Sequence, residues 1–160
     1  MQLNKTYKEG IAILDVYGLP DHSLGHDQDT LGILLSWKLT LIGLTVLEGK
    51  KEHLVNLVYV IISYSHCCIS GQNESISDKT NSVNISRVKE GHLLKLTSSK
   101  KNVDSLTVTL DDAELADLTR CLDKLQADNC IAVNWPDPLR VISQRNNFYI
   151  NPADIRNLIN

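Results

Sequence analysis

Residues 105–130 contain the pattern that most constrains the fold, because an extended segment there passes directly into a helix. Apolar residues alternate with threonines over residues 105–110, the two-residue period of a strand with one buried face. Leucines then recur every three or four residues, the spacing of a helix with one apolar stripe. Asp111 is placed to cap this helix, and Glu114 completes an acidic capping box. These acidic residues are therefore assigned to capping rather than to catalysis or metal binding.

Residues 50–70 show a second helical pattern, with apolar side chains around most of the helix circumference. Such a helix is expected in the centre of the molecule. Its β-branched residues leave a buried strand over residues 58–64 as the alternative, and Gly71 is expected to end the helix. The other extended segments that we expect are residues 10–17, 31–42, 83–88, 92–97 and 131–135, with an irregular link over residues 44–49.

The order of these elements predicts an α+β protein, with an antiparallel or mixed sheet, two main helices packed on one face and a short C-terminal helix. Short extended pieces at residues 139–142 and 148–150 precede that terminal helix, which we expect to begin at Asn151. A strand-rich segment closed by a helix occurs at about residues 10–71 and again at 83–128. This order hints at a pseudo-repeat within a single domain formed by residues 1–160.

The composition narrows the range of partners. The chain has 160 residues, a formal net charge of -3 and four cysteines without the spacing of a zinc site or redox motif. This length is sufficient to bury a core without metals or disulfides, and the net charge gives no general reason to bind nucleic acid. The longest apolar run is too short and too polar for a membrane span, and we expect no signal peptide. We therefore expect a cytoplasmic protein with reduced thiols, no cofactor and no nucleic-acid partner.

The loop over residues 21–29 is the place in the sequence where several metal-capable side chains are close together. His22, His26 and Asp27 are the candidate ligands, because imidazole and carboxylate groups bind zinc and other divalent ions. Polar loops of this composition are also common without a metal, so ordinary surface structure is the competing interpretation.

His66, Cys67 and Cys68 place thiols next to an imidazole, an arrangement that can activate a cysteine nucleophile. Adjacent residues of a helix point about 100° apart. These residues therefore cannot form a compact dyad without partners from elsewhere in the chain, and packing in the core is the favoured interpretation.

The last part of the chain contains residue types that are enriched at protein interfaces. The candidate partner-binding residues are Trp135, Arg140, Arg145, Phe148 and Tyr149. Arginines spread over such a length give only a weak indication of nucleic-acid binding, and solvated surface is the alternative.

Three segments carry recognisable motifs at the ends of expected elements. They are LGILLSWKLTLIG at residues 31–43, EGKKEHLVNLVYVIISYSHCCISG at residues 48–71 and VTLDDAELADLTRCLDKLQAD at residues 108–128. This combination resembles a family of cyanobacterial conserved proteins of unknown function, in which a strand ends at glycine, a helix ends in Ser-Gly and a later helix ends near Ala-Asp. The shared residues look structural, so the resemblance implies no catalytic site.

The resemblance implies a cyanobacterial cell interior and an accessory role near the photosynthetic membrane, with peripheral thylakoid contact. Longer members of that family continue into an apolar membrane-anchoring segment, which residues 1–160 do not contain.

The favoured functional hypothesis is a non-enzymatic interaction or assembly module that binds a protein partner or a second copy of itself. It depends on well-formed sheet and helix signals without an accompanying catalytic motif. The alternative is a metal-dependent or small-molecule-binding enzyme that uses the loop with His22 and His26.

Overall fold

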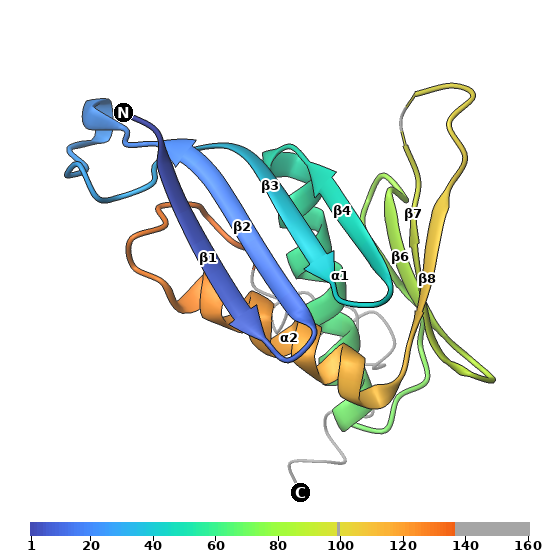
Figure 1. Cartoon of the computed structure of the whole chain (residues 1–160). Coiled ribbons are helices and arrows are strands. Elements are labelled where there is room, and N and C mark those ends of the chain that lie inside the picture. The colour runs from blue at the N-terminus through green and yellow to red at the C-terminus, as the bar shows by residue number, and fades with distance from the viewer. Residues whose placement is uncertain (99, 137–160) are drawn as a thin grey trace, which may run out of the picture.

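The computed structural model describes residues 1–98 and 100–136, in which two four-stranded antiparallel sheets enclose two helices (Figure 1). Sheet 1 has the order β1 (Leu3–Glu9), β2 (Ala12–Leu19), β3 (Ile33–Leu41), β4 (Thr45–Gly49), and sheet 2 has the order β5 (Ile76–Ser77), β6 (Val83–Val88), β7 (Gly91–Leu96), β8 (Leu106–Leu110). Helix α1 (Lys51–Ile69) follows sheet 1, helix α2 (Asp112–Ala127) follows sheet 2, and a short 3-10 helix, η1 (His22–Leu24), lies between β2 and β3. The α+β class is confirmed, although the strands form two sheets rather than one. The expected terminal helix lies outside the described residues.

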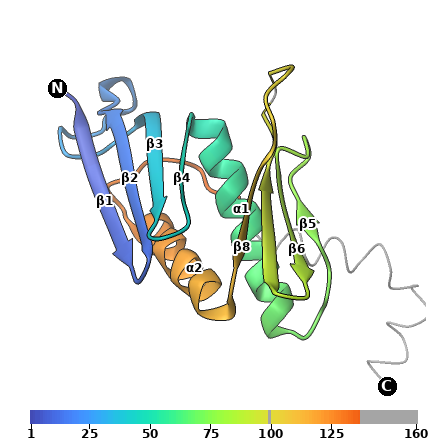
Figure 2. The same ribbon diagram turned by 45° about the vertical axis from the view of Figure 1, so that its right-hand side comes forward.

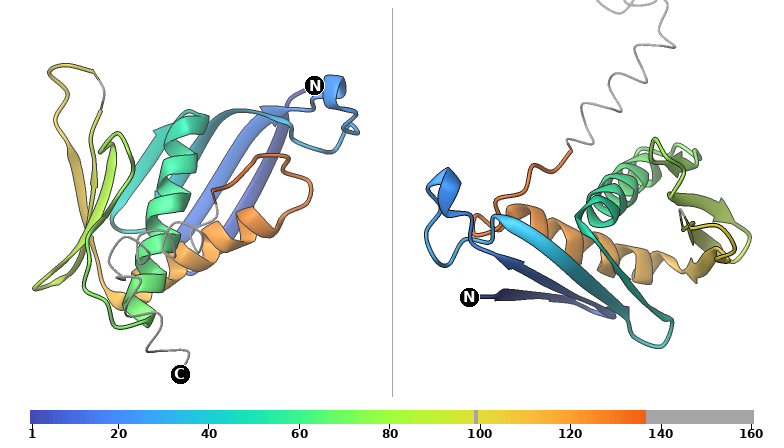
Figure 3. Two further views of the ribbon diagram at one scale, coloured as in Figure 1. Left: turned by 180° about the vertical axis from the view of Figure 1, so that it is seen from behind. Right: turned by 90° about the horizontal axis from the view of Figure 1, so that it is seen from above.

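Both helices lie between the sheets and contact both of them (Figure 2). Helix α2 packs on β1 and β2 of sheet 1 and on β7 and β8 of sheet 2, whereas α1 packs on β3, β5, β6 and α2. Seen from behind, the helices cover one face of sheet 1 (Figure 3). Each sheet therefore has an inner face, which packs on the helices, and an outer face.

Helix α2 begins as its sequence predicts. The Glu114 amide donates to the Asp111 carboxylate over 2.7 Å, and the Asp111 amide donates to the Glu114 carboxylate over 2.9 Å. These two bonds form a complete capping box. The inward leucines of α2 are buried, including Leu118 and Leu122, so the predicted apolar stripe faces the core.

Helix α1 confirms the helical interpretation of residues 50–70 and excludes the alternative strand over residues 58–64. It ends at a glycine with a left-handed backbone, Gly71, whose φ angle is 75°. The Gln72 amide donates to the Cys67 carbonyl and the Gly71 amide donates to the Cys68 carbonyl, the Schellman pattern. A side chain at position 71 would strain this turn.

The first strand of sheet 1, β1, was missed by the sequence prediction. Its polar side chains hide the strand pattern because β1 is an edge strand, in which Tyr7 is the buried member. The turn to β2 uses Gly10, with φ 51°, and a β-carbon there would collide with the Asp117 carboxylate of α2. The expected strand over residues 10–17 is therefore a turn followed by β2.

Strand β3 confirms the extended segment expected over residues 31–42, but its side chains do not alternate regularly between the two faces. The pairing of β2 with β3 shifts between Tyr17 and Gly18, which leaves Leu35 without a partner across the ladder. This β-bulge reverses the alternation, so Leu34 is buried while Ile33 and Leu35 are exposed.

Two shorter segments also differ from expectation. Residues 45–49 form β4 rather than an irregular link, because Leu47 pairs with Leu39 and points inward. Residues 131–135 do not form a strand: Ile131 makes one isolated parallel bridge with Leu31. The Gly32 amide donates to the Leu19 carbonyl of β2. The chain after Leu31 therefore pairs with β2, and the bridge to Ile131 does not extend into a ladder. Among the described residues, no helix has the length and apolar character needed to cross a bilayer.

Candidate functional site

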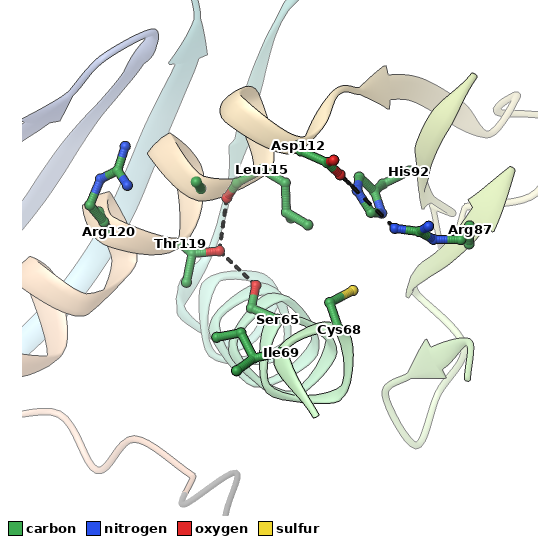
Figure 4. A pocket seen from close by; sticks show the side chains of 10 residues that line it. Ser65, Cys68, Ile69, Arg87, His92, Asp112, Leu115, Thr119 and Arg120 are labelled. Carbon is green, nitrogen blue, oxygen red and sulfur yellow. Dashed lines mark hydrogen bonds and ion pairs between the residues drawn. The ribbon is translucent and has the colours of Figure 1, made fainter. Parts of the chain in front are cut away.

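A pocket of about 470 Å³ lies where the C-terminal half of α1, the N-terminal half of α2 and the β6–β7 hairpin meet (Figure 4). Most of its wall is apolar, formed by side chains such as Ile69 and Leu115. The polar residues at its wall are Ser65, Cys68, Arg87, His92, Asp112, Thr119 and Arg120. The pocket therefore joins elements that are far apart in the sequence.

A continuous chain of hydrogen bonds runs along one wall of this pocket. The Tyr64 hydroxyl lies 2.7 Å from Nδ1 of His92, and Nε2 of His92 lies 2.7 Å from Oδ1 of Asp112. Because a carboxylate only accepts, Nε2 carries the proton and donates to Asp112. In neutral His92, Nδ1 then accepts from the Tyr64 hydroxyl. This network fixes α1, β7 and α2 to one another.

Burial differs sharply along this chain. Tyr64 and His92 are 2% and 1% exposed, whereas the side chain of Asp112 is 89% exposed. The hydrogen bond from His92 is the main cause that lowers the pKa of Asp112, and Arg87, whose Nη2 lies 4.0 Å from Oδ1, adds to it. The buried end of the chain is thus connected to solvent through a charged carboxylate.

Burial first, and then the neighbouring Cys68 thiol, raise the pKa of Tyr64 to about 12, while Arg87 acts in the opposite direction. Tyr64 and Cys68 are four residues apart on α1, so their side chains lie on the same helix face. Figure 4 shows the sulfur of Cys68 directed toward the wall that carries Arg87 and His92.

The floor of the pocket is held by a link between the helices. Thr119 donates through Oγ1 to the Leu115 carbonyl over 2.8 Å, and the Ser65 and Thr119 hydroxyls are 2.7 Å apart. Because the proton of Thr119 is used within α2, the Ser65 hydroxyl is the donor between helices (Figure 4). The pocket wall is therefore preorganised.

The second candidate site is the outer face of sheet 1, which no described element covers. Five of the ten exposed large apolar side chains in the described chain lie on β3, β4 or the turn between them, with exposed fractions from 41% to 54%. We call these five residues the apolar outer face: Ile33, Leu35, Ile42, Leu44 and Val46. A row of charged side chains crosses the middle of the same outer face. In the strand register Asp15 lies opposite Lys38, and Lys38 lies opposite Glu48. We call these three residues the charged row.

The predicted metal loop lies between β2 and β3 and extends away from the sheet (Figure 1). His22 and Asp27 are exposed, and His26 is half-buried with Nδ1 lacking a hydrogen-bond partner among the described atoms. The Asp27 carboxylate instead accepts from Thr30 within the loop. Residues 1–98 and 100–136 contain no group of three or more metal-capable side chains, so the geometry gives the metal hypothesis no support there.

Of the predicted partner-binding residues, Trp135 is described. It is half-buried and packs against the core, while its Nε1 atom has no hydrogen-bond partner in the described chain. The other four candidates, Arg140, Arg145, Phe148 and Tyr149, lie outside the described residues. Their role stays a prediction.

The residues of the pocket were mostly missed by sequence reasoning. Asp112 directly follows the N-cap residue Asp111, and Cys68 was considered only with its neighbours His66 and Cys67. His66 is exposed and Cys67 buried, which agrees with the argument that adjacent helix residues diverge. The i,i+4 spacing of Tyr64 and Cys68 was the available signal. Their pairing with His92 depends on tertiary packing.

The fold and these two sites define an α+β protein with two four-stranded sheets, a pocket lined by its two helices and the β6–β7 hairpin, and an apolar outer face on sheet 1. The chain belongs to the family described as Domain of unknown function (DUF4335), whose model matches residues 5–157. No curated protein and no solved structure matches the chain.

Proposed function

We propose that this protein is a self-associating assembly module, in which the outer face of sheet 1 packs on the same face of a second copy. The apolar outer face carries this proposal. Exposed leucine, isoleucine and valine side chains that gather on one uncovered sheet favour burial against another apolar surface. Two stacked sheets with their strands nearly aligned are a common packing arrangement.

The charged row favours a second copy as the occupant. A two-fold axis parallel to the strands and centred between β2 and β3 places β2 over the partner's β3 and β1 over the partner's β4. Asp15 then lies opposite Lys38 of the partner subunit, and Glu48 lies opposite Thr6 of the partner subunit. Within the described chain Lys38 forms no ion pair, so its charge is available to a partner.

The size of the face predicts modest affinity. Four strands about 4.8 Å apart and the nine residues of β3 at about 3.3 Å each give a face of roughly 600 Å². Two such faces reach only the lower end of the area buried by specific interfaces. We therefore expect a dissociation constant on the order of micromolar to tens of micromolar.

Sedimentation velocity over a concentration series from about 1 to about 200 µM tests the proposal, because this range brackets the expected constant. The native chain should pass from monomer to dimer. Leu35→Lys, on the apolar outer face, should remain monomeric. Leu24→Lys, which changes a leucine that is 70% exposed in the β2–β3 loop, should dimerise like the native chain. A native chain that stays monomeric throughout, or equal effects of both variants, would contradict the proposal.

We further infer a cyanobacterial source, a cytoplasmic location and an accessory role near the photosynthetic membrane. Support for this inference comes from the glycine, Ser-Gly and Ala-Asp motifs at the ends of β3, α1 and α2. Fractionation of cells that carry the tagged protein would test it. Recovery in the cytosol or as a salt-extractable thylakoid fraction is expected, and exclusive recovery outside the cell would contradict it.

A further inference from the structure

Arg87 and Asp112 carry opposite charges on the wall of the pocket between the helices and the β6–β7 hairpin (Figure 4). Nη2 of Arg87 lies 4.0 Å from Oδ1 of Asp112, which is too long for a hydrogen bond, and both side chains are more than half exposed. An ion pair this long and this exposed contributes little to stability. Both charged groups can therefore turn to a ligand at little cost to the fold.

The Asp112 carboxylate is held in one orientation by the buried His92. Nε2 of His92 donates to Oδ1 over 2.7 Å, and the same bond is the main cause that lowers the pKa of Asp112, which keeps this group negatively charged at neutral pH. Arg87 also approaches Oδ1, and Oδ2 accepts no hydrogen bond within the described chain. One carboxylate oxygen is thus fixed and the other is available to a donor.

An apolar surface lies next to these charges. Leu115 and Ala116 follow Asp112 by three and four residues on α2, so the three side chains share one helix face. Ile69 of α1 also lines the pocket and, at 86%, is the most exposed large apolar side chain of the described chain. A ligand that covers these side chains removes apolar surface from water. The pocket, of about 470 Å³, falls within the range of roughly 300–1,000 Å³ found for small-molecule sites.

We propose that this pocket binds a free α-amino acid with an apolar side chain, such as leucine. The α-carboxylate accepts hydrogen bonds from Arg87, and the α-ammonium group donates to Oδ2 of Asp112. Because both charged groups of an α-amino acid are attached to one carbon atom, a single ligand bridges two residues that do not hydrogen-bond each other. The ligand's side chain lies against Leu115 and Ile69.

The charges at the wall favour a zwitterion over a simple anion or cation. A carboxylate without an ammonium group places its negative charge beside Asp112, and an amine without a carboxylate places its positive charge beside Arg87. The second arginine at the wall, Arg120, does not alter this balance, because it pairs with Asp117 at 2.7 Å and with Glu9 at 3.5 Å. The inference is independent of self-association, since no residue of the apolar outer face lines this pocket.

Titration of the full chain at pH 7, followed by the amide NMR spectrum, tests the proposal with four probes. They are L-leucine, isocaproate, which lacks the ammonium group, isoamylamine, which lacks the carboxylate, and glycine, which lacks the side chain. Leucine should bind with a dissociation constant on the order of 0.1–1 mM, as suits so small a ligand. Each of the other probes should bind at least about 10-fold more weakly. Absence of leucine binding, or equal affinity for leucine and isocaproate, would overturn the proposal.

Two variants assign the ligand's charges to their partners. Asp112→Asn keeps an oxygen that accepts from His92 and removes the negative charge, so it should bind leucine and isocaproate equally. Arg87→Gln should bind leucine and isoamylamine equally. The matched controls, Asp104→Asn in the β7–β8 loop and Lys89→Gln in the β6–β7 turn, change other exposed charges and should keep the native preference for leucine. A preference for leucine over isocaproate that persists in Asp112→Asn would refute the assignment.

Discussion

The two sheets share an architecture and differ in what they expose. Each has four antiparallel strands and an inner face that packs on the helices. The outer face of sheet 2 is mostly polar, with half-buried or exposed Asn84, Ser86, Lys95, Thr107 and Thr109 on it. The outer face of sheet 1 instead carries the five exposed apolar side chains of the apolar outer face. The helices cover only the inner faces, and the proposed self-association would bury the apolar side chains on the outer face of sheet 1.

The largest expected effect concerns the inner faces, where the two sheets should behave alike. Leu39 of sheet 1 and Leu94 of sheet 2 are both fully buried. Replacing either by alanine removes packed methyl groups and leaves a cavity, so each change should lower the free energy of unfolding by about 3 kcal/mol. Urea denaturation measures it. A loss near zero for one of the two would mean that its sheet does not contribute equally to the core.

The next effect concerns the outer faces, where the sheets should differ. Val46→Lys places a charge on the apolar outer face, and Thr107→Lys places one at an outward position of the opposite edge strand. The first should weaken dimerisation about tenfold, equivalent to about 1.4 kcal/mol, and the second should leave it unchanged. Analytical ultracentrifugation compares them. Equal weakening by Thr107→Lys would locate the contact elsewhere.

The smallest effect is the pH dependence that Asp78, next to strand β5 of sheet 2, gives to stability. Burial raises the pKa of Asp78, but hydrogen bonds from Thr80, Val83 and Ser82 outweigh it, so the pKa lies below its ordinary value. A carboxyl group with a lowered folded-state pKa contributes stability above its ordinary pKa of about 4, and that contribution is lost as pH falls through the folded value. The β3–β4 turn of sheet 1 uses Gly43, with φ 79°, and has no such carboxylate.

Asp78→Asn should therefore destabilise the protein more at pH 7 than at pH 3. Chemical denaturation at the two values measures the difference in free energy of unfolding between native chain and variant. Asp27→Asn, in the loop before β3, is the matched control, because it alters an exposed carboxylate. If Asp78→Asn lowers the free energy of unfolding by the same amount at both pH values, the ionised Asp78 carboxylate does not provide this stability.

Local signals predicted the helices well, whereas tertiary pairing decided what the sequence could not predict. The capping box at Asp111 and the stop at Gly71 depend on residues within a few positions of each other, so both could be read directly. The bulge at Leu35 depends on the register with β2, and the polar edge strand β1 has too weak a pattern to detect. Likewise, the link from Tyr64 through His92 to Asp112 joins three elements that only the fold brings together.

The charged row of Asp15, Lys38 and Glu48 offers the most direct test of the central claim, that the outer face of sheet 1 binds a second copy of the chain. Sedimentation equilibrium would compare the native chain with Asp15→Lys, Lys38→Asp and the double variant. Each single change should weaken dimerisation, because it places like charges opposite each other across the two-fold axis. The double variant should restore dimerisation, since it exchanges the two charges. A double variant as weak as either single variant would contradict the account.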